Sequence, residues 1–164
     1  EVVEKGQPAL AQIQSVFGDW VLLKNGELNR PALREHIFQH PSARQQLEDI
    51  THPAIRLSII DQLTQARSPY VILVSPLLFE TNQHLLTQRT LLIDASTEIQ
   101  ILRASQRDGQ SIEQIEKIIQ AQMPRYRKLD LADDIAVNDG DLEHLYAQLQ
   151  KIHLNYLNLS THAE

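Results

Sequence analysis

The sequence predicts an α/β fold in which a helical segment precedes a parallel sheet flanked by helices. Two near-continuous apolar runs, at residues 70–75 and 90–94, are typical of parallel strands that are covered on both faces. After residue 67, helical patterns alternate with such runs, as they do in α/β proteins. Residues 7–66 carry no convincing strand, so we expect them to form a helical subdomain or insertion in front of the α/β core.

Four helical patterns fill the segment before the sheet, and each has a proline at or next to its start. Proline suits the first turn of a helix, because the N–H that it lacks would have no partner there. The last pattern also carries isoleucine and leucine at helical spacing. The expected helices cover residues 7–17, 30–39, 42–50 and 53–66.

Behind the apolar run at residues 90–94, the alternation continues to the end of the chain. Residues 97–107 form a helical pattern with a serine before it as the N-cap. Residues 111–114 have the spacing of a capping box, and the apolar stripe behind them runs to Met123, where Pro124 ends or kinks the helix. The remaining expected elements are a strand at residues 134–138 and a helix at residues 141–157.

The composition indicates one globular domain with a sizeable core, and it excludes several classes of protein. The 164 residues are 42% apolar and 22% charged, and no apolar run reaches the length of about 18 residues that a membrane span needs. The net charge of −6 argues against a general nucleic-acid binder, which needs a basic surface. The absence of cysteine excludes disulfides and thiolate metal sites, and it fits a cytoplasmic protein.

One pair of histidines has the spacing of metal ligands. His36 and His40 are four residues apart on an expected helix, so both side chains lie on one face. No third ligand accompanies them in the sequence, and we therefore interpret them as a surface pair and expect no metal site.

Basic residues gather in the segment of residues 103–128, which holds six of the fifteen lysines and arginines. Its net charge is +3, because only three acidic residues oppose them, while the rest of the chain sums to −9. Arg103 and Arg107 are four residues apart and share one face of a helix. Such a cluster indicates a polyanion of the size of a nucleoside triphosphate, since the planar guanidinium binds two phosphate oxygens at once. A solvated helical face is the alternative interpretation.

The strand expected at residues 70–75 leads into the stretch SPLLFE, which ends at Glu80. Ligands of open α/β sheets bind beyond the carboxyl ends of the strands, so we expect residues 76–80 to lie at such a rim. Asp94 and Asn138 occupy the same end of the other two strands. The alternative is that the proline of this stretch only breaks the strand, and that its leucines and phenylalanine belong to the core.

Read together, these stretches resemble the dephospho-CoA kinase family. The likeness extends over nearly all 164 residues, and the motifs HPAI, SPLLFE and RASQRDG carry it by their order and spacing. The resemblance implies a P-loop kinase-like parallel sheet, a helical CoA-binding subdomain and a helical lid. On this likeness, the CoA-binding subdomain covers residues 1–67, the α/β core residues 68–107 and 129–164, and the lid residues 108–128.

The resemblance also implies an activity. Enzymes of this family use ATP, with Mg²⁺, to phosphorylate the ribose 3′-hydroxyl of dephospho-CoA, the last step of coenzyme A synthesis. The expected partners are therefore ATP and dephospho-CoA, and neither nucleic acid nor a membrane. The residues expected to serve ATP binding and the lid are Arg103, Arg107, Arg125, Lys128 and Asn138. Those expected to contact dephospho-CoA are Arg30, His52, Leu77, Leu78 and Glu80.

The parts of the family that hold phosphate and act as general base have no counterpart in this sequence. A P-loop needs G-x-x-x-x-G-K-[ST], whose backbone N–H groups cradle the phosphates, and the chain has no Gly-Lys pair. In the family, this loop and the aspartate that serves as general base precede a V-V-E-x-G stretch, which stands here at residues 2–6. We therefore expect both to lie upstream of Glu1 and the 164 residues alone to be inactive. The alternatives are a non-catalytic remnant that binds CoA or a nucleotide, and a helical interaction protein with an acidic partner.

Overall fold

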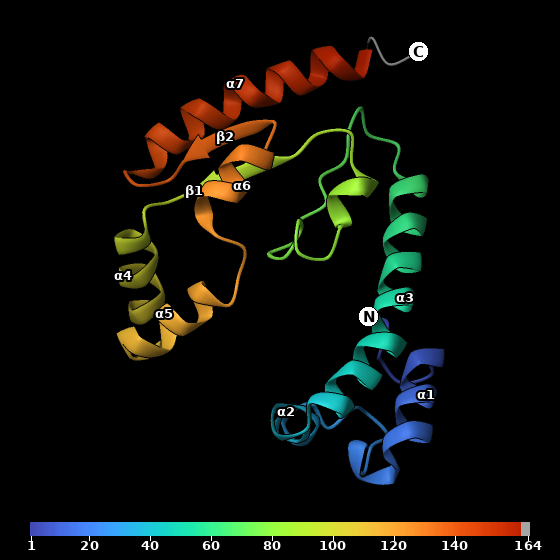
Figure 1. Ribbon diagram of the computed structural model, residues 1–164. Helices are drawn as coiled ribbons and strands as arrows, with labels where there is room; N and C mark the ends of the chain where they lie inside the picture. Colours follow the sequence, from blue (N-terminus) through green and yellow to red (C-terminus); the bar gives the residue numbers. More distant parts are fainter. Residues whose placement is uncertain (162–164) are drawn as a thin grey trace. The chain divides into compact units, whose positions relative to one another are not determined.

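The computed structural model describes residues 1–161, and the chain divides into two compact units, Glu1–Ala66 and Arg67–Glu164 (Figure 1). The boundary between the units falls one residue before the position at which the sequence predicts the end of the helical subdomain. Among the described residues, no helix combines the length and the apolar character that crossing a membrane requires.

Helices make up most of the first unit, and they begin at or next to the prolines of the sequence. Helix α1 (Pro8–Phe17) and helix α2 (Arg30–Gln39) each have a proline in the first turn. A short 3₁₀ helix, η1 (Asp19–Val21), lies between them. The chain turns sharply into η1 at Gly18, whose φ of 91° lies in the left-handed region that favours glycine.

The prediction of two separate helices at residues 42–50 and 53–66 is wrong. Both belong to one helix, α3 (Pro41–Gln65), with Pro53 inside it. Proline removes one backbone hydrogen bond and usually breaks a helix. Helix α3 packs against both α1 and α2, and this tertiary packing outweighs the local cost, because most helical stability in proteins comes from packing.

The core of the first unit joins elements that are distant in the sequence. Ile13 of α1, Val21 of η1 and Leu33 of α2 are buried and contact one another. Leu47 and Ile50 of α3 pack against this cluster. Apolar burial therefore fixes α3 against the other elements of this unit.

A two-stranded parallel sheet forms the centre of the second unit. Strand β1 (Leu91–Asp94) pairs with strand β2 (Asp134–Val137), with Leu91 opposite Asp134 and Asp94 opposite Val137. Both strands lie where the sequence predicts them. The parallel pairing across intervening helices confirms the α/β class.

Four α-helices accompany this sheet in the described part of the second unit, residues 67–161. Helix α7 contacts β2, helix α6 contacts β1, and helices α4 and α5 pack on each other (Figure 1). A 3₁₀ helix, η2, precedes β1. The bounds are Gln83–Leu86 for η2, Thr97–Asp108 for α4, Ile112–Gln120 for α5, Arg125–Leu131 for α6 and Leu142–Thr161 for α7.

The strand predicted at residues 70–75 is wrong for this structure, which has no regular element there. Three of its apolar side chains are instead open to solvent, with Val71 49%, Ile72 68% and Val74 86% exposed, and Leu73 is half-buried. A strand forms only where a neighbour pairs with its N–H and C=O groups, and no segment among residues 1–161 does so here. The sequence also does not predict α6, which begins directly after Pro124.

Candidate active site

The two strands bring their carboxyl ends together in the second unit, as the sequence predicts. Asp94 is the last residue of β1, and its carbonyl oxygen accepts a hydrogen bond of 2.7 Å from the N–H of Asn138. Because β1 and β2 are parallel, the residues that follow both strands leave the sheet at the same edge. This edge is the place where open α/β sheets bind ligands.

The carboxylate of Asp94 is buried and binds one arginine through both oxygens. Arg125, the first residue of α6, donates from Nε to Oδ1 over 2.7 Å and from Nη2 to Oδ2 over 2.5 Å. The side chain of Asp94 is 6% exposed, whereas that of Arg125 is 48% exposed. The hydrogen bonds to Asp94 raise the pKa of the Arg125 guanidinium above its ordinary value. In this structure, Arg125 therefore faces a carboxylate and is not an open phosphate ligand.

Glu80 forms a hydrogen bond and an ion pair with the segment that follows α5 in the sequence. Its Oε1 accepts a 2.8 Å hydrogen bond from the N–H of Met123 and lies 3.4 Å from Nζ of Lys128. Lys128 also donates to the side-chain oxygen of Gln122 over 3.1 Å. Burial raises the pKa of Glu80, but the Met123 N–H and the Lys128 charge outweigh it, and the pKa ends below its ordinary value.

Arg103 holds the loop that follows β2. From α4, it donates from Nη1 to the carbonyl oxygen of Asn138 over 2.6 Å and from Nη2 to that of Gly140 over 3.3 Å. Asp139 in the same loop accepts a 2.7 Å hydrogen bond from the N–H of Ser96, the N-cap of α4. Arg103 and Asn138, both predicted from the sequence, are thus joined, with the arginine bonded to main-chain carbonyl groups.

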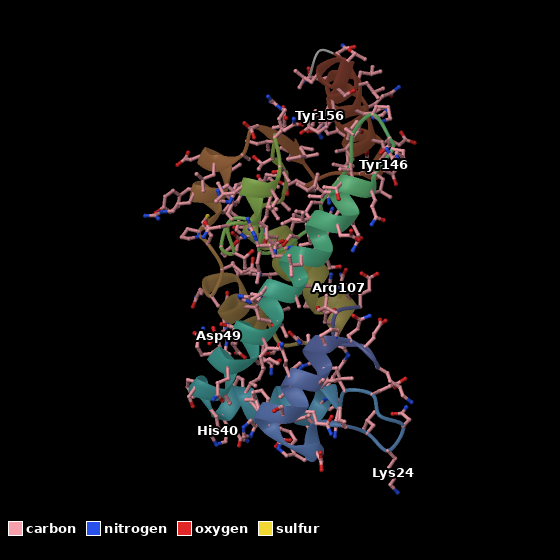
Figure 2. The ribbon with its side chains drawn as sticks, turned by 90° about the vertical axis from the view of Figure 1, so that its right-hand side faces the viewer. Lys24, His40, Asp49, Arg107, Tyr146 and Tyr156 are labelled. Carbon is pink, nitrogen blue, oxygen red and sulfur yellow. The ribbon has the colours of Figure 1, made fainter. Side chains whose placement is uncertain are left out.

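Arg107, labelled in Figure 2, lies at the end of α4 that is away from β1, and its partner is a partly exposed carboxylate rather than a main-chain carbonyl group or a buried carboxylate. It lies in the last turn of α4, and within residues 1–161 it pairs only with its neighbour Asp108, over 2.7 and 2.8 Å. The side chains are 77% and 36% exposed, respectively. The Asp108 carboxylate raises the pKa of Arg107 and has its own pKa lowered in turn. The guanidinium can therefore exchange this partner for another anion.

The residues predicted to contact dephospho-CoA are divided between the two units. In the second unit, Leu77 is 41% exposed and Leu78 is half-buried, whereas Phe79 is buried against the ring of His84. Of the apolar residues in the SPLLFE stretch, only the phenylalanine thus belongs fully to the core. In the first unit, Arg30 and His52 are exposed on α2 and α3.

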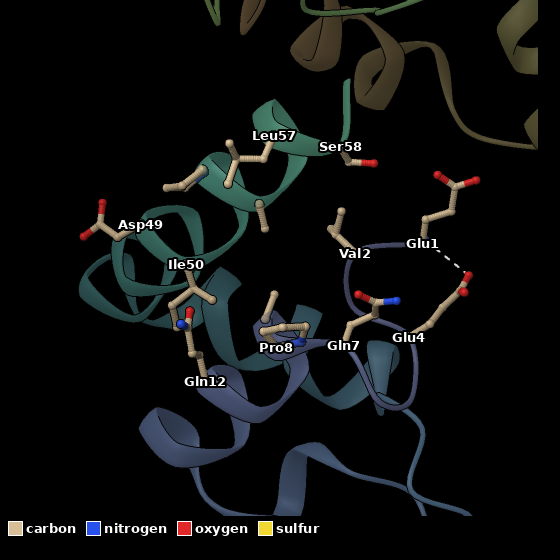
Figure 3. A pocket seen from close by; sticks show the side chains of 13 residues that line it. Glu1, Val2, Glu4, Gln7, Pro8, Gln12, Asp49, Ile50, Leu57 and Ser58 are labelled. Atoms are coloured by element: carbon tan, nitrogen blue, oxygen red, sulfur yellow. Dashed lines mark ion pairs between the residues drawn. The ribbon is translucent and has the colours of Figure 1, made fainter. Parts of the chain in front are cut away.

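The first unit contains a groove that the sequence does not predict, with a volume of about 720 Å³ between the N-terminal segment, α1 and α3 (Figure 3). The side chains around it include the carboxylates of Glu1, Glu4 and Asp49. Neither Arg30 nor His52 lines it. Three carboxylates disfavour a polyphosphate, so we do not assign this groove to a nucleotide.

No cluster of three or more potential metal ligands occurs within residues 1–161. The rings of His36 and His40 stack with their centroids 4.5 Å apart. Nδ1 of His40 lies 2.9 Å from the carbonyl oxygen of His36, and one ring nitrogen is therefore bound to the main chain.

The comparison with known proteins agrees with this geometry. The family described as dephospho-CoA kinase matches residues 1–144. A dephospho-CoA kinase of Acinetobacter baylyi is 71% identical over 158 residues, which cover 96% of this chain and 81% of the relative. Its namesake in Psychrobacter cryohalolentis is 47% identical over 163 residues, which cover 98% of this chain and 71% of the relative.

Two solved structures have the same fold. A Thermus thermophilus protein is 30% identical, with a TM-score of 0.73, over 89% of this chain and 73% of the other. The dephospho-CoA kinase from Campylobacter jejuni is 26% identical, with a TM-score of 0.66, over 92% of this chain and 77% of the other. These likenesses confirm the predicted α/β fold of the P-loop kinase type. The chain belongs to the dephospho-CoA kinase family.

Proposed function

We propose that the protein transfers the γ-phosphoryl group of ATP to the ribose 3′-hydroxyl of dephospho-CoA and so produces coenzyme A. The observation that carries this proposal is the 71% identity to a relative named dephospho-CoA kinase. The exposed guanidinium of Arg107 supports it chemically, because phosphoryl transfer depends on positioning and on stabilisation of negative charge. The cytoplasm, which holds both substrates, is the proposed location.

Arg107 is the proposed ligand of the ATP phosphates. Its guanidinium is exposed, and its only partner within residues 1–161 is the adjacent and partly exposed Asp108. When a phosphate replaces that carboxylate, Asp108 stays in contact with water and no buried charge is left unpaired. The exchange therefore costs little free energy. Asn138, which follows β2 and whose loop is fixed by Arg103, is the proposed contact of the adenine ring.

Dephospho-CoA is proposed to contact the residues that follow the exposed segment 70–75. Leu77 and Leu78 offer apolar surface to the acceptor, and Arg30 and His52 of the helical unit offer groups for its phosphates. Residues 1–67, which include all of the helical unit, are accordingly the proposed acceptor-binding subdomain. Residues 108–128 are the proposed lid.

Mg²⁺ is expected to arrive with ATP. It is a hard cation that prefers oxygen ligands and is commonly held in kinases by one or two carboxylates and the phosphates of the substrate. The buried carboxylate of Asp94 is engaged by Arg125 through both oxygens. We therefore expect the phosphate oxygens, rather than Asp94, to be its main ligands at this edge.

The direct test measures coenzyme A formation from ATP and dephospho-CoA by the complete gene product. Formation of a product phosphorylated at the 3′ position supports the proposal, and binding of both substrates without turnover favours a non-catalytic remnant. The 164 residues by themselves should show no useful turnover, because their sequence lacks the Gly-Lys pair of a phosphate-binding loop. Measurable turnover by them would refute this part of the proposal.

Arg107→Ala tests the assigned phosphate ligand in the complete gene product. We expect kcat/KM for ATP to fall about 10- to 150-fold, the range that one hydrogen bond to a charged group represents, with KM for dephospho-CoA unchanged. Lys117→Ala is the matched control, since it removes an exposed positive charge from the same segment. If Arg107→Ala and Lys117→Ala have equal kcat/KM values for ATP, Arg107 is only a solvated charge and not a phosphate ligand.

A further inference from the structure

We propose that Glu80 and Asp94 form a clamp on the lid root, residues 122–128, and that Arg125 and Lys128 position the lid instead of binding the nucleotide. This inference rests on the proposed function, since it concerns how the same site is arranged. It adds positioning residues to the reaction and divides the basic residues of the segment 103–128 into anchors and a phosphate ligand.

The clamp has two points, which come from separate parts of the second unit. Asp94 at the end of β1 binds the side chain of Arg125 through two hydrogen bonds. Glu80, fourteen positions earlier in the chain, binds the N–H of Met123 and the ammonium of Lys128. Both carboxylates thus bind the same seven-residue segment, and two points of attachment fix its orientation as well as its position.

Burial separates the anchors from the phosphate ligand. Asp94 is almost completely buried, and a buried carboxylate that loses its only cationic partner is strongly destabilised. Arg125 therefore cannot move to a phosphate without leaving an unpaired charge in the core. Lys128 and Glu80 are half-buried, with side chains 18% and 21% exposed. Arg107 has the opposite setting, since water solvates Asp108 as soon as the arginine leaves.

The position of the clamp defines where the lid can bend. Residues 121–124 connect α5 to α6 and lie outside both helices. Arg125 holds α6 at β1, and Glu80 holds the N–H of Met123 within this connection, so movement of α5 has to occur at residues 121–122, ahead of the first main-chain anchor. Because α5 packs on α4, whose last turn carries Arg107, the clamp also sets the range within which Arg107 can meet a phosphate.

A double-mutant cycle distinguishes an anchor from a ligand. Asp94→Asn, Arg125→Gln and the double variant are compared in the complete gene product by kcat/KM for ATP. For a clamp, both single changes lower it about 10- to 100-fold, and the double variant recovers part of the loss of Arg125→Gln because the buried charge is gone. For a phosphate ligand, Asp94→Asn leaves kcat/KM unchanged or raises it, and the double variant remains as poor as Arg125→Gln.

The control removes a comparable charge from the lid root without removing an anchor. Arg127 lies two positions from Arg125 on α6, is exposed and makes no ion pair within residues 1–161. Arg127→Gln should leave kcat/KM for ATP within about twofold of the unchanged protein. A loss as large as that of Arg125→Gln would mean that the general charge of α6 matters, and it would overturn the clamp.

Met123 provides a local readout that needs no activity. It is the only methionine in these 164 residues, and its N–H is bonded to Glu80. We expect slow amide hydrogen exchange at Met123, measured by NMR, which Glu80→Ala accelerates at least tenfold. Glu80→Gln, which keeps the accepting oxygen, should preserve most of the protection.

The NMR signals of Met123 test the clamp independently of the proposed function. They also provide a test where one of the variants does not fold. If the unchanged protein makes no coenzyme A but Glu80→Ala releases the Met123 amide and Asp94→Asn shifts its methyl signal, the proposed function fails and the clamp holds. If coenzyme A is made but the Met123 signals stay unchanged in both variants, the clamp is refuted. Where Asp94→Asn does not fold, the Glu80 pair of variants decides by the same criterion.

Discussion

Replacing Ile13 with alanine should destabilise the helical unit, because this side chain lies at the centre of its core. Ile13 is 0% exposed and contacts Val21 and Leu33 from two other elements. The change removes three carbon atoms, which is worth roughly 2–2.5 kcal/mol of transfer free energy at about 0.8 kcal/mol for each CH₂ group. The cavity left behind adds to this, so we expect a loss of about 2–5 kcal/mol in the free energy of unfolding.

Two further variants calibrate this loss. Ile13→Val removes a single methylene and should cost about 0.5–1.5 kcal/mol. Val16→Ala lies on the same helix, but Val16 is 49% exposed, so its cost should stay well below that of Ile13→Ala. The three variants together separate burial from helix propensity, since all of them change α1.

Trp20 makes the measurement specific for this unit. It is the only tryptophan, it lies in η1 next to the core, and its ring centroid is 5.0 Å from that of His36. Urea unfolding followed by its fluorescence should show the midpoint of Ile13→Ala lowered by about 1 M or more, given slopes of about 1–3 kcal/mol per M. Equal midpoints for Ile13→Ala and Val16→Ala would refute the assigned core.

Two predictions concern the second unit. Ser111→Ala should cost about 1 kcal/mol in the free energy of unfolding, measured by urea titration, because the serine accepts the N–H of Gln114 in a complete capping box; Ser111→Asp should restore most of it. Burial, followed by the hydrogen bond to Asp134, raises the pKa of Tyr156 from 10.0 to about 12. The protonated phenol therefore contributes stability that is complete below pH 10 and lost as the pH rises through 12. Tyr156→Phe should flatten the stability curve in this interval, and an unchanged curve would contradict the assignment.

The local features of this fold could be predicted from the sequence. The capping box at Ser111 is formed by residues three positions apart, so its pattern is complete within the sequence itself. The strands β1 and β2 follow apolar runs, and their parallel pairing places Asp94 beside Asn138 as the sequence predicts. In each case, a short stretch determines the conformation, and a general rule of sheet topology supplies the rest.

Features that depend on a distant partner could not be predicted. The apolar run at residues 70–75 has the composition of a strand, but pairing depends on a neighbour that the run itself does not specify. Pro53 reads as a helix start, although packing by α1 and α2 keeps it inside α3. The partner of Arg125 lies 31 positions away, and the sequence contains no signal that selects Asp94 over other carboxylates.

The same limit applies to charge counting, which treats the basic residues of the segment 103–128 as equivalent. The structure adds two carboxylates from outside this segment, Glu80 and Asp94, and they reduce its net charge of +3 to +1. The attraction for a polyanion is therefore weaker than the sequence predicts, and it is not evenly distributed. Arg107 is exposed in the last turn of α4, where water can solvate the carboxylate that it leaves, and Lys117 and Arg127 are exposed without an ion pair among residues 1–161. The function of each cation then follows from the free energy of separating it from its present partner, which is large for Arg125 and small for Arg107.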